Sequence, residues 1–271
     1  MNQSFLSAAI AFVALGVAFP CGAAAGCSRP IAVPVSANGA SVQMAADGIR
    51  GIYPDLLRGV ADSAGCSFDF ALVPRARQVA LYGLGQADIL IPASHTTERD
   101  RHGTFVPLIS TRPMLISVEG NHAPVTSAQD LLDRRDLRVA VVRGFDYGEG
   151  YMALTAELAK QGRLFVEVDV TSVARLLHAG SADLTIMGPS TMISVARREP
   201  RVQGLFARLR TDAIAELPWR YSGAYVSKAL PKEDQQQLLD ALEKAARTNS
   251  VMDGYVHYFG PDLLKGGVRP R

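Results

Sequence analysis

Short apolar segments alternate with helical segments along this chain, and the alternation constrains its fold more than any other feature. Residues 31–35 and 87–91 are apolar runs, and residues 68–72 alternate apolar and polar side chains, as strands do. Between these runs, residues 54–64 and 76–82 carry apolar side chains at helical spacing. The order strand, helix, strand, helix, strand predicts an α/β fold with mostly parallel sheets flanked by helices.

The second half of the chain repeats this order after a break at residues 120–124. We therefore predict two lobes joined by a two-strand hinge, with residues 26–117 and 218–271 in the first lobe and residues 118–217 in the second. Ser190 is expected to cap the helix that follows the last strand of the second lobe. The tail, residues 265–271, is expected to be frayed.

Residues 1–25 carry no charged side chain and include an apolar run over residues 8–19. That run has the length of a signal-peptide core and is too short to span a membrane. With three alanines at residues 23–25 as a cleavage site, it predicts a signal peptide over residues 1–25, hence export. A buried N-terminal helix is the alternative. Lipid anchoring at Cys27 is disfavoured, because the leucine that usually leads such a site is missing.

Two cysteines, Cys27 and Cys66, remain after the predicted cleavage. An even number in an exported chain predicts a disulfide between them, and two buried free thiols are the alternative. The net charge of +2 is too small to indicate a nucleic-acid partner or a strongly membrane-seeking surface. The histidines show no metal-ligand spacing, and neither CxxC nor GxSxG occurs after residue 25. We therefore expect no metal and no cofactor.

The third apolar run breaks at Pro92 and leads into Ser94, Thr96 and Arg99. Polar side chains at the carboxyl end of a strand are how open α/β sheets build ligand crevices. The guanidinium of Arg99 offers a planar fork of donors that fits a carboxylate. A solvated turn with a surface Arg–Glu pair is the alternative.

A set of short motifs in order resembles the extracellular solute-binding proteins of the polar amino acid class, the receptors of ABC importers. The motifs are Gly51–Leu57, Gly65–Phe68, Pro74–Arg77, Gly85–Asp88, Thr96–Arg99 and Gly103–Leu108. The resemblance implies a type II periplasmic-binding-protein fold, a ligand held between the lobes, a location in the periplasm and a membrane permease as partner. It also implies a monomer that is not an enzyme and binds no nucleic acid.

The resemblance assigns roles to five of this chain's residues. Arg99 would clamp a ligand carboxylate, and Thr96 would cap the next helical turn with its N–H directed at the same carboxylate. Ser94 would hydrogen-bond the ligand from the strand end. Gly144 and Phe145 would open the second-lobe helix that closes on the carboxylate from the other side.

Two departures from that family's pattern bear on the ligand. Arg75 stands where relatives often have an aromatic side chain, and Gly188 stands near the place of an acid that would bind an ammonium group. The first adds a cation near Arg99, and the second removes an amine anchor, so we expect a small anion such as a dicarboxylate. Arg77 either adds a further cation to the cleft or packs the lobe.

Two other functions remain open on the same scaffold. A periplasmic enzyme resembling cyclohexadienyl dehydratase would need a general acid, for which Glu98, Asp146 and Glu149 are the candidates. A ligand-sensing component that acts through a partner is the other alternative.

Overall fold

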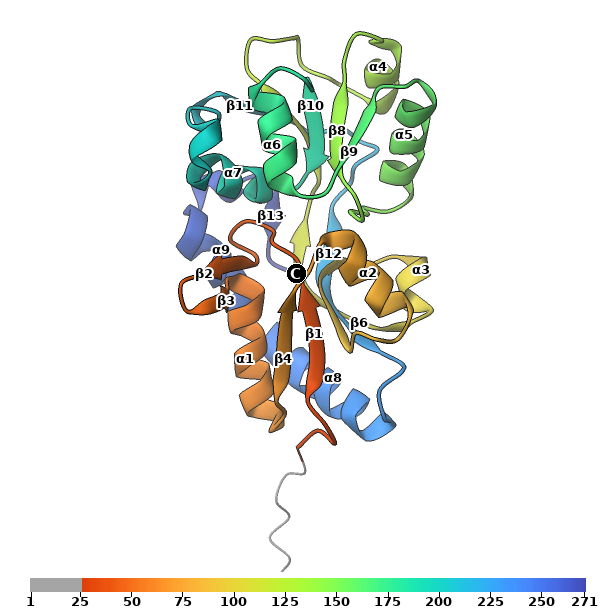
Figure 1. The fold of residues 1–271 in the computed structure, drawn as a ribbon, viewed down its shortest axis with the longest axis vertical. Helices are drawn as coiled ribbons and strands as arrows, with labels where there is room; N and C mark the ends of the chain where they lie inside the picture. The colour runs from red at the N-terminus through yellow and green to blue at the C-terminus, as the bar shows by residue number, and fades with distance from the viewer. Residues whose placement is uncertain (1–25) are drawn as a thin grey trace, which may run out of the picture.

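The structure is a computed structural model that describes residues 26–271, so the predicted signal peptide lies outside the described residues. Figure 1 shows two lobes stacked along the long axis of the molecule, with helices on the outside of each. The predicted two-lobed α/β fold is confirmed. Within residues 26–271, no helix has the length and apolarity needed to cross a membrane.

The first lobe contains both ends of the described chain. Its strands are β1 (Ile31–Val35), β2 (Gln43–Ala45), β3 (Gly48–Arg50), β4 (Phe68–Leu72), β5 (Ile89–Ser94), β6 (Gly103–Thr111), β12 (Arg220–Ser227) and β13 (Val268–Arg269). Its helices are α1 (Ile52–Ala64), α2 (Arg75–Gly83), α3 (Thr97–Asp100), α8 (Lys232–Ala246) and α9 (Ser250–Phe259). Strands β13, β6, β12 and β5 form an antiparallel sheet in that order, whereas β1 pairs in parallel with β4.

The second lobe is built around one five-stranded sheet in the order β11–β7–β10–β8–β9. Its strands are β7 (Met114–Val118), β8 (Val139–Val142), β9 (Leu164–Glu167), β10 (Leu184–Met187) and β11 (Leu209–Asp212). Its helices are α4 (Ala128–Asp133), α5 (Glu149–Lys160), α6 (Val170–His178) and α7 (Pro189–Arg198). Short 3-10 helices occur at Pro200–Val202 and Phe206–Arg208 in this lobe and at Asp262–Leu264 in the first. Parallel pairing joins β8 to β9 and β10, and antiparallel pairing adds β7 and β11. Both lobes therefore combine parallel pairs with antiparallel ones rather than being mostly parallel.

Helix α1 follows from local sequence signals. Pro54 lies in its first turn, and Gly65 ends it with φ 64°, a left-handed conformation that glycine adopts readily. Its apolar face is buried in the first-lobe core, where Leu57 is fully buried. Just beyond the helix, Cys66 bonds to Cys27, which confirms the predicted disulfide.

Strand β5 continues past the predicted break at Pro92 and ends at Ser94. The strand tolerates proline because its pairing with β12 is irregular between Gly223 and Tyr225, which lie opposite Ala93 and Leu90. Proline has no N–H for a ladder, so a bulge is where a strand accepts it. Strand β5 consequently extends to the interface between the lobes.

The chain crosses into the second lobe earlier than the predicted boundary at residue 118. Strand β7 pairs with β10 and β11, so its residues lie in the second-lobe sheet, and the crossing falls at Arg112 and Pro113. The Arg112 guanidinium donates to the carbonyls of Leu217 and Ile214 at 3.1 and 3.0 Å. This side chain therefore joins the outgoing and returning segments of the hinge.

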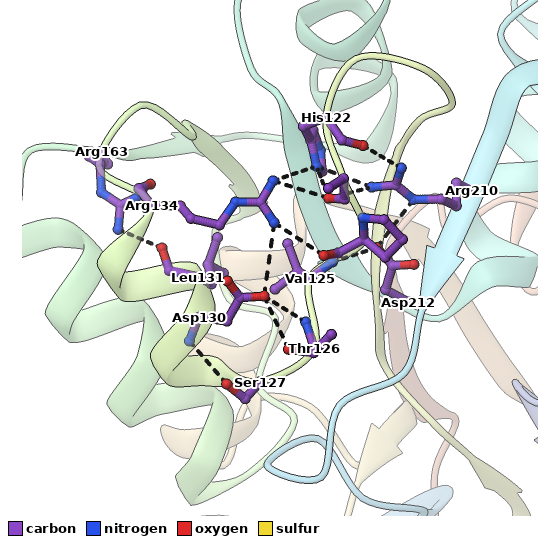
Figure 2. Close-up of polar contacts among 12 residues, drawn as sticks. His122, Val125, Thr126, Ser127, Asp130, Leu131, Arg134, Arg163, Arg210 and Asp212 are labelled. Carbon is purple, nitrogen blue, oxygen red and sulfur yellow. Dashed lines mark hydrogen bonds and ion pairs between the residues drawn. The ribbon is translucent and has the colours of Figure 1, made fainter.

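A cluster of polar contacts holds the loop after β7 against the rest of the second lobe (Figure 2). Arg210 of β11 donates to the His122 carbonyl at 2.6 Å, and Arg134 donates to the Ala123 carbonyl at 3.0 Å. Both guanidinium groups also contact Nδ1 of His122. The cluster lies beside α4, at the end of the lobe farthest from the first lobe, so it orders the loop and not the interlobe cleft.

The tail is ordered, contrary to the expectation that it frays. Strand β13 pairs with β6, and the Arg112 N–H donates to the Gly267 carbonyl at 2.9 Å. The Arg269 guanidinium lies 4.3 Å from the centre of the Trp219 ring. These partners lie far away in sequence, so the tail sequence alone does not reveal them.

Candidate ligand-binding site

A small cavity lies between the lobes, with a volume of about 70 Å³. The first lobe supplies the loop after β1, the start of α2, the ends of β5 and β6, and parts of β12, α9 and the tail. The second lobe supplies the loop after β8 and the start of α7. Its polar lining includes Ser36, Asn38, Arg75, Ser94, Asp146, Tyr147, Ser190, Thr191, Ser222 and Tyr255. A larger groove of about 500 Å³ shares Asp146 and Tyr147 with it. The carboxyl end of β5 therefore meets the cleft, as expected for an α/β ligand site.

The two lobes are in contact around this cavity. The Ala40 N–H, in the loop after β1, donates to Ser194 Oγ of α7 at 2.8 Å. Gly144 has φ +85°, and a Cβ there would lie 3.0 Å from the backbone N and Cα of Ala76 in α2. The lobes are therefore closed on each other, which accounts for the small cavity.

Arg75 begins α2 and is the buried cation of the cavity wall. Its side chain is 8% exposed, and Nη1 donates to Gln78 Oε1 at 2.7 Å. Gln78 is itself held by hydrogen bonds to the carbonyls of Pro34 and Ile91. Nε of Arg75 is buried without a hydrogen-bond partner. A buried donor without an acceptor lowers the stability of the folded protein, unless a ligand supplies the acceptor.

Arg99 lies behind the wall rather than in it. The residue is 5% exposed, and Nη1 donates to the Ser94 carbonyl at 2.8 Å. Thr96 caps α3 by accepting the Arg99 N–H at 3.3 Å. The N–H of Thr96 itself donates to the Tyr225 hydroxyl at 3.1 Å, so the expectation that it points at a ligand carboxylate is wrong for this structure.

The site is electropositive. Burial, and then the nearby Arg99, lowers the pKa of Arg75 from 12.5 to about 9, so Arg75 remains a cation at neutral pH at an energetic cost. Burial also lowers the pKa of Arg99, while Asp146 acts in the opposite direction on both arginines. Two cations lie near one carboxylate, and an anion bound in the cavity would reduce the repulsion between the cations.

The loop between β8 and α5 forms the second-lobe side of the site. Phe145, Asp146 and Tyr147 line the cavity, and Asp146 Oδ1 accepts the Gly148 N–H at 2.7 Å. Helix α5 begins at Glu149, so Gly144 and Phe145 precede the helix instead of opening it. Burial raises the pKa of the Tyr147 phenol, which keeps it a neutral hydroxyl in the cleft.

The structure places the residues predicted from sequence in five different environments. Arg75, Ser94 and Phe145 line the cavity, and Thr96 lines the larger groove. Gly144 is a contact between the lobes, and Arg99 is buried next to Ser94. Arg77 is exposed on α2 and is not among the residues of either wall, so the structure does not bring it to the cleft.

The sequence analysis did not predict several of the residues that line the cavity. Asn38 follows β1 and has a buried Oδ1 without a partner, and its position after a strand end was an available signal. Ser190 was interpreted as a helix cap, but Gly188 occupies that position and Pro189 begins α7. Tyr255, on α9, reaches the cavity only through the packing of the folded lobe, which no local pattern indicates.

No family model matches the sequence, and neither does any curated protein. Solved structures are similar in fold. The arginine-, lysine-, histidine-binding protein ArtJ of Geobacillus stearothermophilus has a TM-score of 0.69 at 19% identity, covering 88% of this chain and 99% of that one. The GluR0 ligand-binding core in complex with L-glutamate has a TM-score of 0.66 at 21% identity, covering 87% and 100%.

A histidine kinase sensor domain described as similar to periplasmic binding proteins has a TM-score of 0.65 at 18% identity, covering 89% of this chain and 98% of that one. These three examples include binding proteins and a sensor domain, and each is matched over nearly its whole length. At these identities the likeness establishes the architecture alone. The chain has the two-lobed fold of the periplasmic binding proteins.

Proposed function

We propose that this chain is a periplasmic receptor that captures a small anionic carboxylate or amino-acid-like solute between its lobes and delivers it to the membrane permease of an ABC importer. The observation that carries the proposal is Arg75, a cation buried in the wall of the interlobe cavity with Nε unpartnered and a second buried arginine nearby. Its guanidinium fork suits a carboxylate. Similar solved structures bind arginine or glutamate, which supports a ligand of amino-acid size.

In this proposal the receptor is a monomer, and it captures the solute when its two lobes close. Lobes that part at the hinge admit the solute, and lobes that close around it exclude water and strengthen its ionic contacts. The hinge bonds of Arg112 join both crossing segments, so the lobes can rotate about them without separating.

A thermal-shift screen tests the ligand class. Only the folded protein binds, so a ligand raises the melting temperature by mass action. We expect succinate, glutarate, L-aspartate and L-glutamate to raise it more than L-lysine, L-arginine or neutral amino acids. Each compound should be recovered chemically unchanged after incubation. A preference for cationic ligands would contradict the proposal, and a dehydrated or hydrolysed product would favour the enzyme alternative.

Arg99→Ala tests the role assigned to Arg99 within the proposal. If Arg99 binds a ligand carboxylate inside the closed cleft, its loss costs about 2–5 kcal/mol, or about thirtyfold to a few thousandfold in affinity. Arg99→Lys should recover part of the loss, because lysine lacks the planar fork. Calorimetric titration gives the affinities, and circular dichroism confirms folding. A folded variant with near-native affinity would place the carboxylate elsewhere, beginning with Arg75.

A further inference from the structure

The cavity wall contains acceptors as well as donors that lack partners. Asn38 Oδ1 is buried without a hydrogen bond. Asp146 holds the Gly148 N–H through Oδ1, and no hydrogen bond to its second oxygen, Oδ2, is present within residues 26–271. Arg75 Nε is the matching donor without a partner. A ligand that satisfies this wall supplies an acceptor to the arginine and donors to the two oxygen-bearing side chains.

Asp146 faces the arginines from the opposite lobe and stays apart from them. It acts electrostatically on both Arg75 and Arg99, yet the described part of the chain contains no ion pair between Asp146 and either one. Asp146 and Arg75 line the same cavity and come from opposite lobes. An anionic group on one side of that space and a cationic group on the other would match the charges of the wall.

A fully ionised dicarboxylate meets only half of this requirement. It offers acceptors to the arginines but no N–H or O–H donor, and its charge is repelled by Asp146. A protonated amine offers three donors and a positive charge. The sequence argument that this chain lacks an amine anchor depends on Gly188, whereas Asp146 comes from a different loop of the same lobe.

We propose that Asp146 binds a protonated amine of the solute, with Asn38 as a second acceptor, so that the solute is a zwitterion of net negative charge: an acidic amino acid. This inference rests on the proposed receptor function and specifies the substrate class of its site. The two carboxylates and the ammonium group of the solute would then balance the charges of Arg75 in the wall, Arg99 behind it and Asp146. The cavity of about 70 Å³ favours the smaller members of the class.

Matched pairs of compounds that differ only in the amine test this assignment. The pairs are L-aspartate with succinate and L-glutamate with glutarate, titrated calorimetrically into the folded protein at neutral pH. Hydrogen bonds between charged groups lead us to expect the amino acid of at least one pair to bind about ten- to a hundredfold more tightly than its partner. In Asp146→Asn this ratio should fall to about one, and succinate should bind more tightly than it does to the unaltered protein, because a repelling charge is gone.

Asp136→Asn is the control, since it makes the same change at an exposed aspartate of the same lobe; its ratio should equal that of the unaltered protein. Circular dichroism confirms that both variants fold. Equal binding of amino acid and diacid by the unaltered protein would overturn the amine anchor and leave the anion receptor standing. A ratio unchanged in Asp146→Asn would overturn the role of Asp146. Failure of all four compounds to bind would contradict the anionic solute and this inference together.

Discussion

Arg75 shows how a single residue can favour binding at the expense of stability. Its charge is buried in the cleft, and within residues 26–271 its side chain makes a single hydrogen bond, from Nη1 to Gln78. Gln78 does not depend on that bond, because its Oε1 also accepts the Ser36 hydroxyl at 3.0 Å. The arginine can therefore be replaced without leaving Gln78 unpaired. Removing a poorly compensated buried charge is often neutral or stabilising.

We expect Arg75→Met to keep or raise the free energy of unfolding, by up to about 1 kcal/mol, because methionine fills much of the volume without a charge. The same change should weaken binding of succinate or L-aspartate at least about tenfold. Urea unfolding and calorimetric titration measure the two effects. Arg77→Met, on the exposed side of the same helix, should alter both by less than about 1 kcal/mol. A marked loss of stability in Arg75→Met with intact binding would show that Arg75 is structural.

At the scale of elements, the disulfide fixes the segment that precedes strand β1. Cys27 precedes β1, and Cys66 lies between α1 and β4, the parallel partner of β1. The bond therefore joins the beginnings of two neighbouring strands. It lies at the end of the first lobe opposite the cleft, where β1 and β4 begin (Figure 1).

Replacing both cysteines by serine should lower the free energy of unfolding without changing affinity. For a sequence separation of 39 residues, the chain-entropy model gives an upper value of about 4 kcal/mol. At roughly 2–4 °C per kcal/mol for a chain of this size, the melting temperature should fall by up to about 16 °C. Calorimetry of the variant, with thiol titration of the unreduced parent protein, measures this. Two titratable thiols in the denatured parent would contradict the disulfide.

The sequence predicted the elements whose boundaries depend on their own residues. Helix α1 is an example, since Pro54 and Gly65 lie within or next to it. Strand β5 was predicted too short, because its tolerance of Pro92 depends on the bulge opposite, on β12. The ordered tail was missed for the same reason, as its pairing partner β6 lies far back along the chain.

The residues of the site also differ in whether their own segment of sequence could reveal them. Ser94 was predicted because it stands at the end of an apolar strand, and Arg75 through the resemblance to the solute-binding proteins; both line the cavity. The sequence left open whether Arg77 lies in the cleft with Arg75 or packs the lobe, and in the structure α2 buries Arg75 and exposes Arg77. Asn38 follows a strand end, a signal that the sequence offered, whereas Tyr255 reaches the cavity only through the packing of α9 in the folded lobe.

For the whole molecule, closure depends on backbone contacts that only small residues allow. Gly144 in the second lobe lies against the backbone of Ala76 and Arg75 in the first. Ser194 of α7 accepts the Ala40 N–H across the same interface. A side chain at Gly144 would separate two backbones that have no flexible atoms to move aside.

Gly144→Ala should hold the lobes slightly apart and weaken ligand binding by about tenfold or more, because a Cβ would lie 3.0 Å from Ala76. Small-angle scattering with saturating ligand should show a larger radius of gyration than the parent protein shows. Gly162→Ala is the matched control: its φ is also positive, at +68°, but a Cβ there meets nothing within 4 Å. Gly162→Ala should have backbone strain similar to that of Gly144→Ala but the ligand affinity of the unaltered protein. Equal affinities in the two variants would show that Gly144 does not govern closure.

The tail has a practical consequence. Gly267 and Val268 line the cavity, and a Cβ at Gly267 would lie 3.1 Å from the ring of Pro189 in the second lobe. A fluorescent dye attached at Lys265, an exposed residue two positions before Gly267, would therefore sit beside the moving interface and change its surroundings whenever the lobes part. The described chain begins at the opposite end of the first lobe, so a dye there would give a steady reference signal. The molecule thus offers one position for a sensor and another for its internal standard.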